Sequence, residues 1–174
     1  MALLKDELVH LSFSLIAGFL LFWLFGSFWF FPACLFWGFL IDVDHLFDYF
    51  YCFFKKTDKK TIKKNLFNFS FHLKNFFNPE YYVLKNRKVF VPLHGWEYLP
   101  IFWLFLRILG KKWGIIGLEW SVLAYFFHLC WDQHTSAGNY FSYFFFYRFK
   151  NNFSYKAYRG IIDNKDKIKK AAEK

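Results

Sequence analysis

The chain has 174 residues, a formal net charge of +10 and an unusually high aromatic content of 28%. Hydrophobic residues make up 56% of it, which excludes an intrinsically disordered chain or a collagen-like repeat. The three cysteines, Cys34, Cys52 and Cys130, are widely spaced and form neither a disulfide framework nor a CxxC zinc motif.

The first apolar stretch is long enough to enter a membrane. Between Leu11 and Ile41 there are 31 consecutive residues without a charge, whereas a membrane-spanning helix needs about 20. Gly26, Ser27 and Pro32 interrupt this stretch and favour a break within it. We therefore expect one helix over about residues 9–25 and a second over about residues 29–50.

The rest of the chain contains two further apolar runs, at residues 99–109 and 113–131, and an aromatic stretch at residues 140–149 that is typical of an interfacial anchor. Residues 55–74 are rich in lysine and read either as a basic amphipathic segment or as a solvated loop. The predicted fold is an all-α membrane protein, a bundle of about four short transmembrane or interfacial helices plus this basic amphipathic segment.

The positions of the basic residues predict the topology. Residues 1–10 contain one lysine or arginine, residues 50–96 contain ten and residues 148–174 contain nine, which places 20 of the 23 on one side of a four-helix bundle. The positive-inside rule makes that side cytoplasmic. We expect a multi-pass protein of the inner (plasma) membrane with cytoplasmic termini, consisting of a membrane-embedded domain at residues 1–150 and a basic cytoplasmic tail at residues 151–174.

Placing a polar side chain in the hydrocarbon interior of a membrane costs free energy, so the polar residues in and beside the apolar runs are candidates for a functional site. Under the predicted topology they gather at the cytoplasmic ends of the four helices. The expected metal ligands are His10, Asp44, His45, His94, His128 and Asp132.

The spacing of these residues suits metal binding. His128 and Asp132 are four residues apart, so on a helix they share one face and can hold the same cation. Histidine nitrogens together with carboxylate oxygens favour zinc, with manganese or iron as alternatives. Asp42 and Glu97 are the candidate proton acceptors. Each residue taken singly also has a structural interpretation, such as a helix cap or a hydrogen-bonded pair inside a bundle.

Two motifs resemble a known family. The string from His128 through Asp132, Thr135 and Ala137 to Gly138 resembles the H-x3-D-x2-T-x-A-G motif of the YdjM-like inner-membrane proteins, a family classed as metal-dependent hydrolases. The segment from Asp42 to His45 resembles that family's P-D-x-D-H motif, although Ile41 replaces the proline.

Other parts of the family pattern agree only partly. His10 stands where the family has an early histidine, but the H-R-G-x-T-H-S element survives only around His94 and Gly95. The resemblance implies a metal site formed by these histidines and aspartates and a hydrolytic activity. Its helical cluster of histidines and aspartates is distantly similar to that of zinc-dependent phospholipases C, which suggests a phosphoester substrate.

The leading hypothesis is a membrane-bound metal-dependent hydrolase acting on an amphiphilic phosphoester. The alternative is a non-catalytic membrane protein whose metal or His/Asp cluster is structural. In both cases the expected partners are membrane lipids, with anionic headgroups bound by the basic segments. Cation or proton transport ranks lower because the polar residues lie mainly at helix ends, and nucleic-acid binding is not expected because the topology accounts for the charge.

Overall fold

The computed structural model describes residues 2–77, 86–135 and 138–159, and every regular element within these ranges is helical. The predicted all-α class is therefore confirmed. The chain divides into two compact units: residues 1–43 with 93–135 form the first, and residues 44–92 with 136–174 form the second. Residues 160–174 of the predicted basic tail lie outside the described residues, so the division into a membrane domain and a tail stays a prediction.

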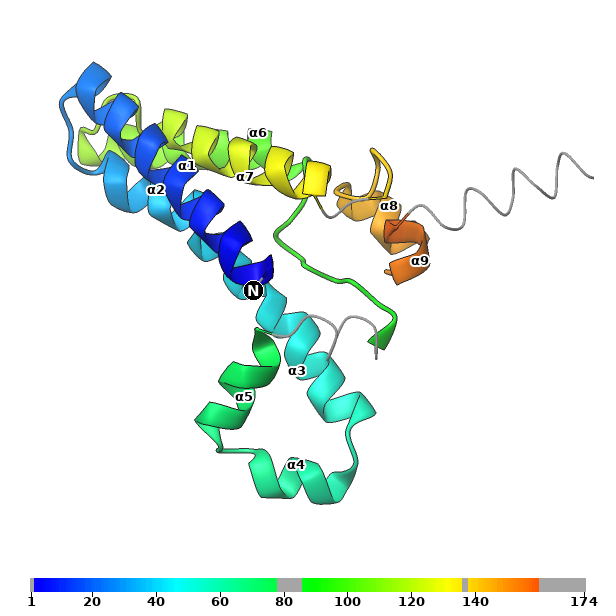
Figure 1. The fold of residues 1–174 in the computed structure, drawn as a ribbon. Coiled ribbons are helices and arrows are strands. Elements are labelled where there is room, and N and C mark those ends of the chain that lie inside the picture. Colours follow the sequence, from blue (N-terminus) through cyan, green and yellow to red (C-terminus); the bar gives the residue numbers. More distant parts are fainter. Residues whose placement is uncertain (1, 78–85, 136–137, 160–174) are drawn as a thin grey trace, which may run out of the picture. The chain divides into compact units, whose positions relative to one another are not determined.

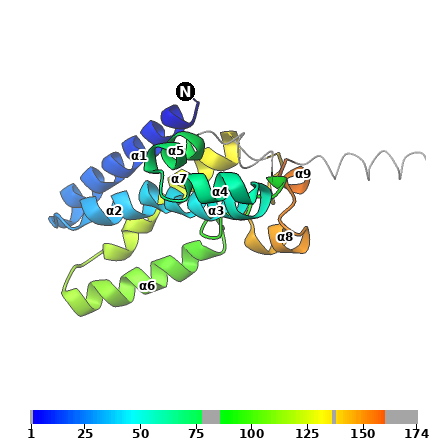
Figure 2. The same ribbon diagram turned by 90° about the horizontal axis from the view of Figure 1, so that it is seen from below.

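Four α-helices build the first unit: α1 (Ala2–Phe25), α2 (Phe30–Gly38), α6 (Tyr98–Trp113) and α7 (Val122–Thr135). The helices α1, α2 and α7 pack against one another, and α1 and α2 run antiparallel, side by side (Figures 1 and 2). Small side chains let the three helices approach closely around a common core. Its buried members are Ala17, Leu21, Phe30, Cys34 and Ala124.

Glycines end the helices of this unit at two places. Gly26, with a φ of 70°, lies in the turn between α1 and α2, where the sequence favours a break. Gly114, also with a φ of 70°, is the left-handed residue that ends α6. A short 3-10 helix, Leu118–Ser121, then leads into α7. These turns allow short antiparallel helices to pack together.

The predicted helix over residues 29–50 is divided. The helix α2 ends at Gly38, Phe39 leaves the helical conformation, and a 3-10 helix covers Leu40–Asp44 before α3 (His45–Lys56) begins. Glycine is a poor helix former, and aspartate side chains compete for backbone hydrogen bonds, which explains why the helix does not continue through this segment. The change of pitch alters the direction of Asp42 relative to a continuous α-helix.

The second unit contains α3 and the short helices α4 (Lys59–Asn65), α5 (Phe69–Phe76), α8 (Phe145–Lys150) and α9 (Tyr155–Tyr158). The basic segment of the sequence thus forms two short helices. Asp58 caps α4 by accepting a hydrogen bond of 2.8 Å from the backbone N–H of Thr61. This bond to the charged form holds the pKa of Asp58 below its usual value.

Two charged side chains of the second unit hold the segment around Val91. Asp48 accepts hydrogen bonds from the backbone N–H groups of Phe90 and Val91, at 2.8 and 3.3 Å. The guanidinium of Arg148 donates to the carbonyl of Val91 at 3.1 Å. Burial lowers the pKa of Arg148. Both side chains satisfy backbone groups that have no helical partner, which is a structural role.

Candidate metal centre

The inner face of α7 carries two of the predicted ligands. The buried residues of this helix recur every three or four positions, as expected for one face. They are Val122, Ala124, Tyr125, His128, Leu129 and Asp132. One helical turn separates His128 from Asp132, and the His128 Nε2 atom lies 3.2 Å from an Asp132 carboxylate oxygen, Oδ2.

His94 reaches the same place from the loop that precedes α6. Its Nε2 atom lies 2.9 Å from Nε2 of His128 and 3.5 Å from Oδ2 of Asp132. The loop is tied to α7 by Tyr125, whose hydroxyl lies 2.6 Å from the carbonyl oxygen of Leu93 and accepts a hydrogen bond of 3.1 Å from the N–H of Gly95. Tyr125 therefore fixes the backbone on both sides of His94.

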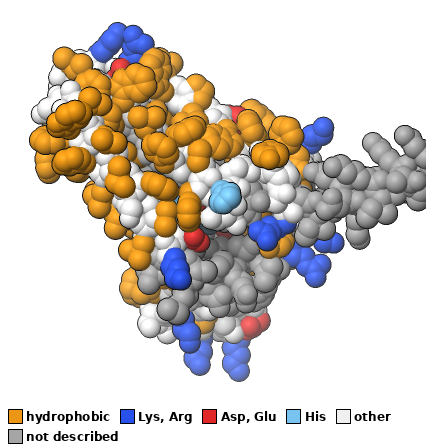
Figure 3. Space-filling model, turned by 45° about the horizontal axis from the view of Figure 1, so that its top comes forward, with side chains coloured by type: hydrophobic (Ala, Val, Ile, Leu, Met, Phe, Trp, Pro, Cys, Tyr) orange, Lys and Arg blue, Asp and Glu red, His pale blue; other side chains and the backbone are white. Residues whose placement is uncertain are grey.

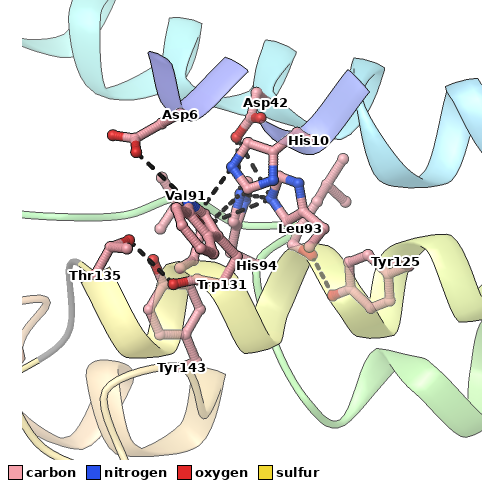
Figure 4. Close-up of polar contacts among 12 residues, drawn as sticks. Asp6, His10, Asp42, Val91, Leu93, His94, Tyr125, Trp131, Thr135 and Tyr143 are labelled. Carbon is pink, nitrogen blue, oxygen red and sulfur yellow. Dashed lines mark hydrogen bonds and ion pairs between the residues drawn. The ribbon is translucent and has the colours of Figure 1, made fainter. Parts of the chain in front are cut away.

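Asp42 completes the group from the 3-10 helix that follows α2. Its Oδ1 atom lies 3.1 Å from Nε2 of His94 and 3.5 Å from Nε2 of His128. Figure 4 shows Asp42 and His94 meeting above α7. Three segments that are distant in the sequence thus supply two imidazoles and two carboxylates, and all four offer ligand atoms within 4.8 Å of one another. We call Asp42, His94, His128 and Asp132 the four-residue cluster.

The spacing of the four-residue cluster fits a tetrahedral metal ion. Zinc binds nitrogen and oxygen at about 2.0–2.2 Å, so two ligands of a regular tetrahedron are about 3.3–3.6 Å apart. The five interatomic distances given above for the cluster range from 2.9 to 3.5 Å. A small outward movement of the side chains would bring the closest pairs to the ideal separation. The cluster can therefore hold a metal ion.

The hydrogen bonds of His128 leave one of its nitrogens facing the cluster. Its Nδ1 atom lies 3.0 Å from the carbonyl oxygen of Gly38, which can only accept, so Nδ1 carries a proton. In the neutral ring, Nε2 then presents a lone pair toward the cluster. Metal-binding histidines are commonly oriented by such a bond from the other ring nitrogen. The backbone of α2 therefore selects the tautomer that a metal requires.

Charge and burial also favour a cation. The side chains of His94 and His128 are 1% and 0% exposed, and those of Asp42 and Asp132 are 12% and 11% exposed. Two carboxylates held together with so little access to water need positive charge nearby, and a divalent ion would balance both of them. The mixed nitrogen and oxygen ligands suit zinc, manganese or iron.

His10 lies beside the cluster and contacts its outer side. Its Nε2 atom is 3.1 Å from Oδ1 of Asp132, the carboxylate oxygen that does not face His128, and its ring lies 3.9 Å from the ring of His128. The side chain comes from α1 and is buried (Figure 4). The structure thus brings His10, a predicted ligand, into contact with the outer side of Asp132, where a residue just outside the ligands can orient a carboxylate.

Three other predicted residues are not part of this cluster. Asp44 and His45 belong to the second unit, where they stand at the start of α3. Glu97 is in the first unit but precedes α6 and lies near Gly95, and it is outside the four-residue cluster. Asp42, predicted as a proton acceptor, also stands among the possible ligands. Ala137 of the family motif lies outside the described residues.

Sequence reasoning missed two positions that support the site. In the sequence, Tyr125 looks like the other aromatic core residues, and Gly38 looks like the other small residues of the apolar run. Their roles depend on contacts with backbone groups at distant positions, which spacing does not reveal. One signal was available, because Tyr125 lies three residues before His128 and so shares its helical face.

Comparison of the chain with family models, with curated proteins and with solved structures finds no match in any of the three.

Proposed function

We propose that the protein is a membrane-embedded hydrolase that depends on a divalent metal ion. The observation that carries this proposal is the four-residue cluster, in which two imidazole nitrogens and two carboxylate oxygens converge at distances suited to one ion. In the arrangement that we propose, His94, His128 and Asp132 hold the metal and Asp42 is the proton acceptor. Such three-ligand sites are typical of catalytic zinc.

The length and exposure of α1 support a membrane location. Residues Lys5–Phe25 form a 21-residue apolar segment, long enough to cross a bilayer, and only 28% of its most apolar window is buried. A core helix of a water-soluble protein would be mostly buried. Within the part of the chain that the structure describes, a second candidate segment is present only if α2 and the helical residues from Leu40 to Lys55 count as one broken span.

The surface of the first unit supports the same location. Large apolar side chains are exposed on α1, α2 and α6, and hydrophobic side chains cover much of the face drawn in Figure 3. Water-soluble proteins rarely expose such extensive apolar surface. Among the exposed residues are Phe19, Trp23, Phe36, Ile101, Leu104 and Ile108. We propose that these helices lie in the inner membrane and that the lysines of α4 contact anionic headgroups.

The cluster provides the parts that a hydrolysis reaction needs. A divalent cation held there would polarise the scissile group and make a water molecule more acidic. In this proposal Asp42 accepts the proton of the attacking water, which is supported by the position of its carboxylate beside His94 and His128 and by its 12% exposure. The carbonyl of Gly38 keeps His128 in the metal-binding tautomer, and His10 orients Asp132. A phosphoester of a membrane lipid is the substrate class that we propose.

The same residues carry the resemblance to the YdjM-like family. His128, Asp132 and Asp42 belong to its motifs, and they lie together in one unit with His10, the residue that matches the family's early histidine. We propose that the resemblance reflects membership of that family. This convergence supports the proposal because the motifs are separated by more than 80 residues of sequence.

The exchange Asp42→Asn tests the proposed division of roles. If Asp42 accepts a proton, the variant should keep one metal ion per chain while the rate of phosphoester hydrolysis falls by about 10²–10⁴-fold. Bis(p-nitrophenyl) phosphate and a phospholipid in mixed micelles are suitable substrates, and metal content is measured on the same samples. An inactive wild type with bound metal would contradict hydrolysis.

The second candidate is a structural metal site. It is favoured by the number of possible ligands, because four protein ligands close a tetrahedral site and leave no position for water. Asp42→Asn should then weaken metal binding itself. Cobalt(II) provides an independent measurement: added inorganic phosphate should change the visible spectrum of the cobalt-loaded protein if one position is open, and should leave it unchanged if all four residues bind the metal.

A further inference from the structure

The first unit contains an apolar pocket between α2 and α6. Its volume is about 270 Å³, and all eleven of its lining residues carry aromatic or aliphatic side chains without a charge. The innermost of them, Trp37, Leu106 and Leu118, are at most 8% exposed. Because no lining side chain is charged, the pocket suits a hydrocarbon group and not a sugar, a nucleotide or a phosphate.

The rim of the pocket is as apolar as its floor. Trp29, Phe36, Phe105 and Trp113 line the pocket and are 50–63% exposed. Sites for soluble protein partners usually have a polar rim around an apolar centre. Here the rim continues into the exposed apolar surface of α2 and α6. In a membrane, an occupant can therefore enter the pocket directly from the hydrocarbon interior of the bilayer.

The volume limits what can enter. Apolar cavities of about 150 Å³ hold a molecule such as benzene, and sites for drug-sized ligands begin at about 300 Å³. A pocket of about 270 Å³ lies between these sizes. It suits a segment of one flexible chain better than a fused-ring compound or a whole lipid.

We propose that this pocket binds an acyl chain of a membrane lipid and that this lipid is the substrate. The second part rests on the proposed function. Trp37 in the pocket floor directly precedes Gly38, whose carbonyl orients His128. Along α6, Leu106 lies eight residues after Tyr98, or about 12 Å, and His94 stands just before this helix. A lipid chain can therefore lie in the pocket while its headgroup approaches the four-residue cluster.

Filling the pocket tests the binding of the chain. The full-length protein in nanodiscs is exposed to a phospholipid with a photoreactive diazirine in its acyl chain, and labelled residues are mapped by mass spectrometry. In the wild type, labelling of residues 29–37 and 105–118 should exceed that of the exposed residues Phe19 and Trp23 on α1. Ala33→Phe should reduce it several-fold, because Ala33 lines the pocket. Leu104→Phe, an exposed position on α6 outside the lining, should leave labelling unchanged.

A second measurement separates this proposal from the proposed function. In the metal-loaded protein, Ala33→Phe should raise KM for a long-chain phosphoester and leave KM for a short-chain, soluble one unchanged.

Uniform labelling of all apolar surfaces, or labelling unaffected by Ala33→Phe, would overturn the acyl-chain site. Pocket labelling in a protein that hydrolyses neither substrate would preserve the site and overturn the proposed hydrolase. Equal effects of Ala33→Phe on both substrates would overturn the assignment of the bound lipid as substrate.

Discussion

At the scale of single residues, the pair of imidazoles is the feature that most favours metal binding by the four-residue cluster. The Nε2 atoms of His94 and His128 are 2.9 Å apart, and Nδ1 of His128 already carries the proton donated to Gly38. Without a metal, two nitrogen lone pairs would repel each other at this distance, so one of the two Nε2 atoms must carry a proton. That proton would be on Nε2 of His94, or it would be a second proton on His128. A metal ion between the nitrogens would bind both lone pairs and also neutralise Asp42 and Asp132.

The exchange His10→Ala should weaken metal binding without abolishing it. His10 contacts the outer oxygen of Asp132, and loss of such an orienting partner typically costs about 10–100-fold in metal affinity. Competition with a chromogenic chelator measures the change in Kd. His134→Ala is the matched control, because His134 is an exposed histidine at the end of α7. Complete loss of bound metal in His10→Ala would show that His10 is itself a ligand.

The exchange Tyr125→Phe should also lower metal affinity, although it removes no ligand. The hydroxyl of Tyr125 holds the backbone on both sides of His94, and its loss leaves a buried N–H and carbonyl without this partner. Metal titration followed by isothermal calorimetry measures the effect, with the exposed Tyr140→Phe as control. Equal affinity in the two variants would show that the loop around His94 needs no such support.

At the scale of helices, the site depends on how closely α2 approaches its neighbours. A Cβ atom on Gly38 would lie 2.9 Å from that of Ala124 and would collide with the hydroxyl of Ser14. The absence of a side chain therefore lets α2 pack against α1 and α7 and lets its carbonyl reach His128. One glycine thus links the packing of three helices to the orientation of a possible ligand.

Gly38→Ala should therefore reduce both stability and metal affinity. Overpacking of this kind typically costs about 1–3 kcal/mol, and the movement of α2 would lengthen the hydrogen bond to His128. Thermal unfolding in detergent, with and without metal, measures the two effects. Cys130→Ala on the exposed side of α7 is the control. An unchanged melting temperature in Gly38→Ala would contradict the close packing of these helices.

The sequence predicts helices better than it predicts their breaks. Spacing alone places His128 and Asp132 on one face of a helix, since four residues make about one turn. It does not predict the interruption after Gly38, because a continuous apolar run is compatible with one helix or two. That interruption separates Asp42 from Asp44 and His45, which fall in different compact units. Side chain to backbone contacts, such as that of Tyr125, depend on tertiary structure and leave no periodic pattern.

At the scale of the whole molecule, its apolar exterior should determine where the protein resides. The exposed apolar side chains of α1, α2 and α6 lead us to expect that the protein stays in the membrane pellet after extraction with alkaline carbonate, which removes peripheral proteins. A known peripheral protein from the same cells serves as control. Release into the supernatant would contradict membrane embedding and would leave the exposed apolar surface to be covered by a protein partner.

The most direct test of the metal centre is the metal content of the detergent-purified protein, measured by elemental mass spectrometry. The wild type and His134→Ala should contain one zinc, manganese or iron ion per chain, whereas His128→Ala should contain little or none, because His128 contacts His94, Asp42 and Asp132. Circular dichroism shows whether each variant retains its helices. Absence of metal from the folded wild type after reconstitution, or equal metal content in His128→Ala and His134→Ala, would contradict the metal centre.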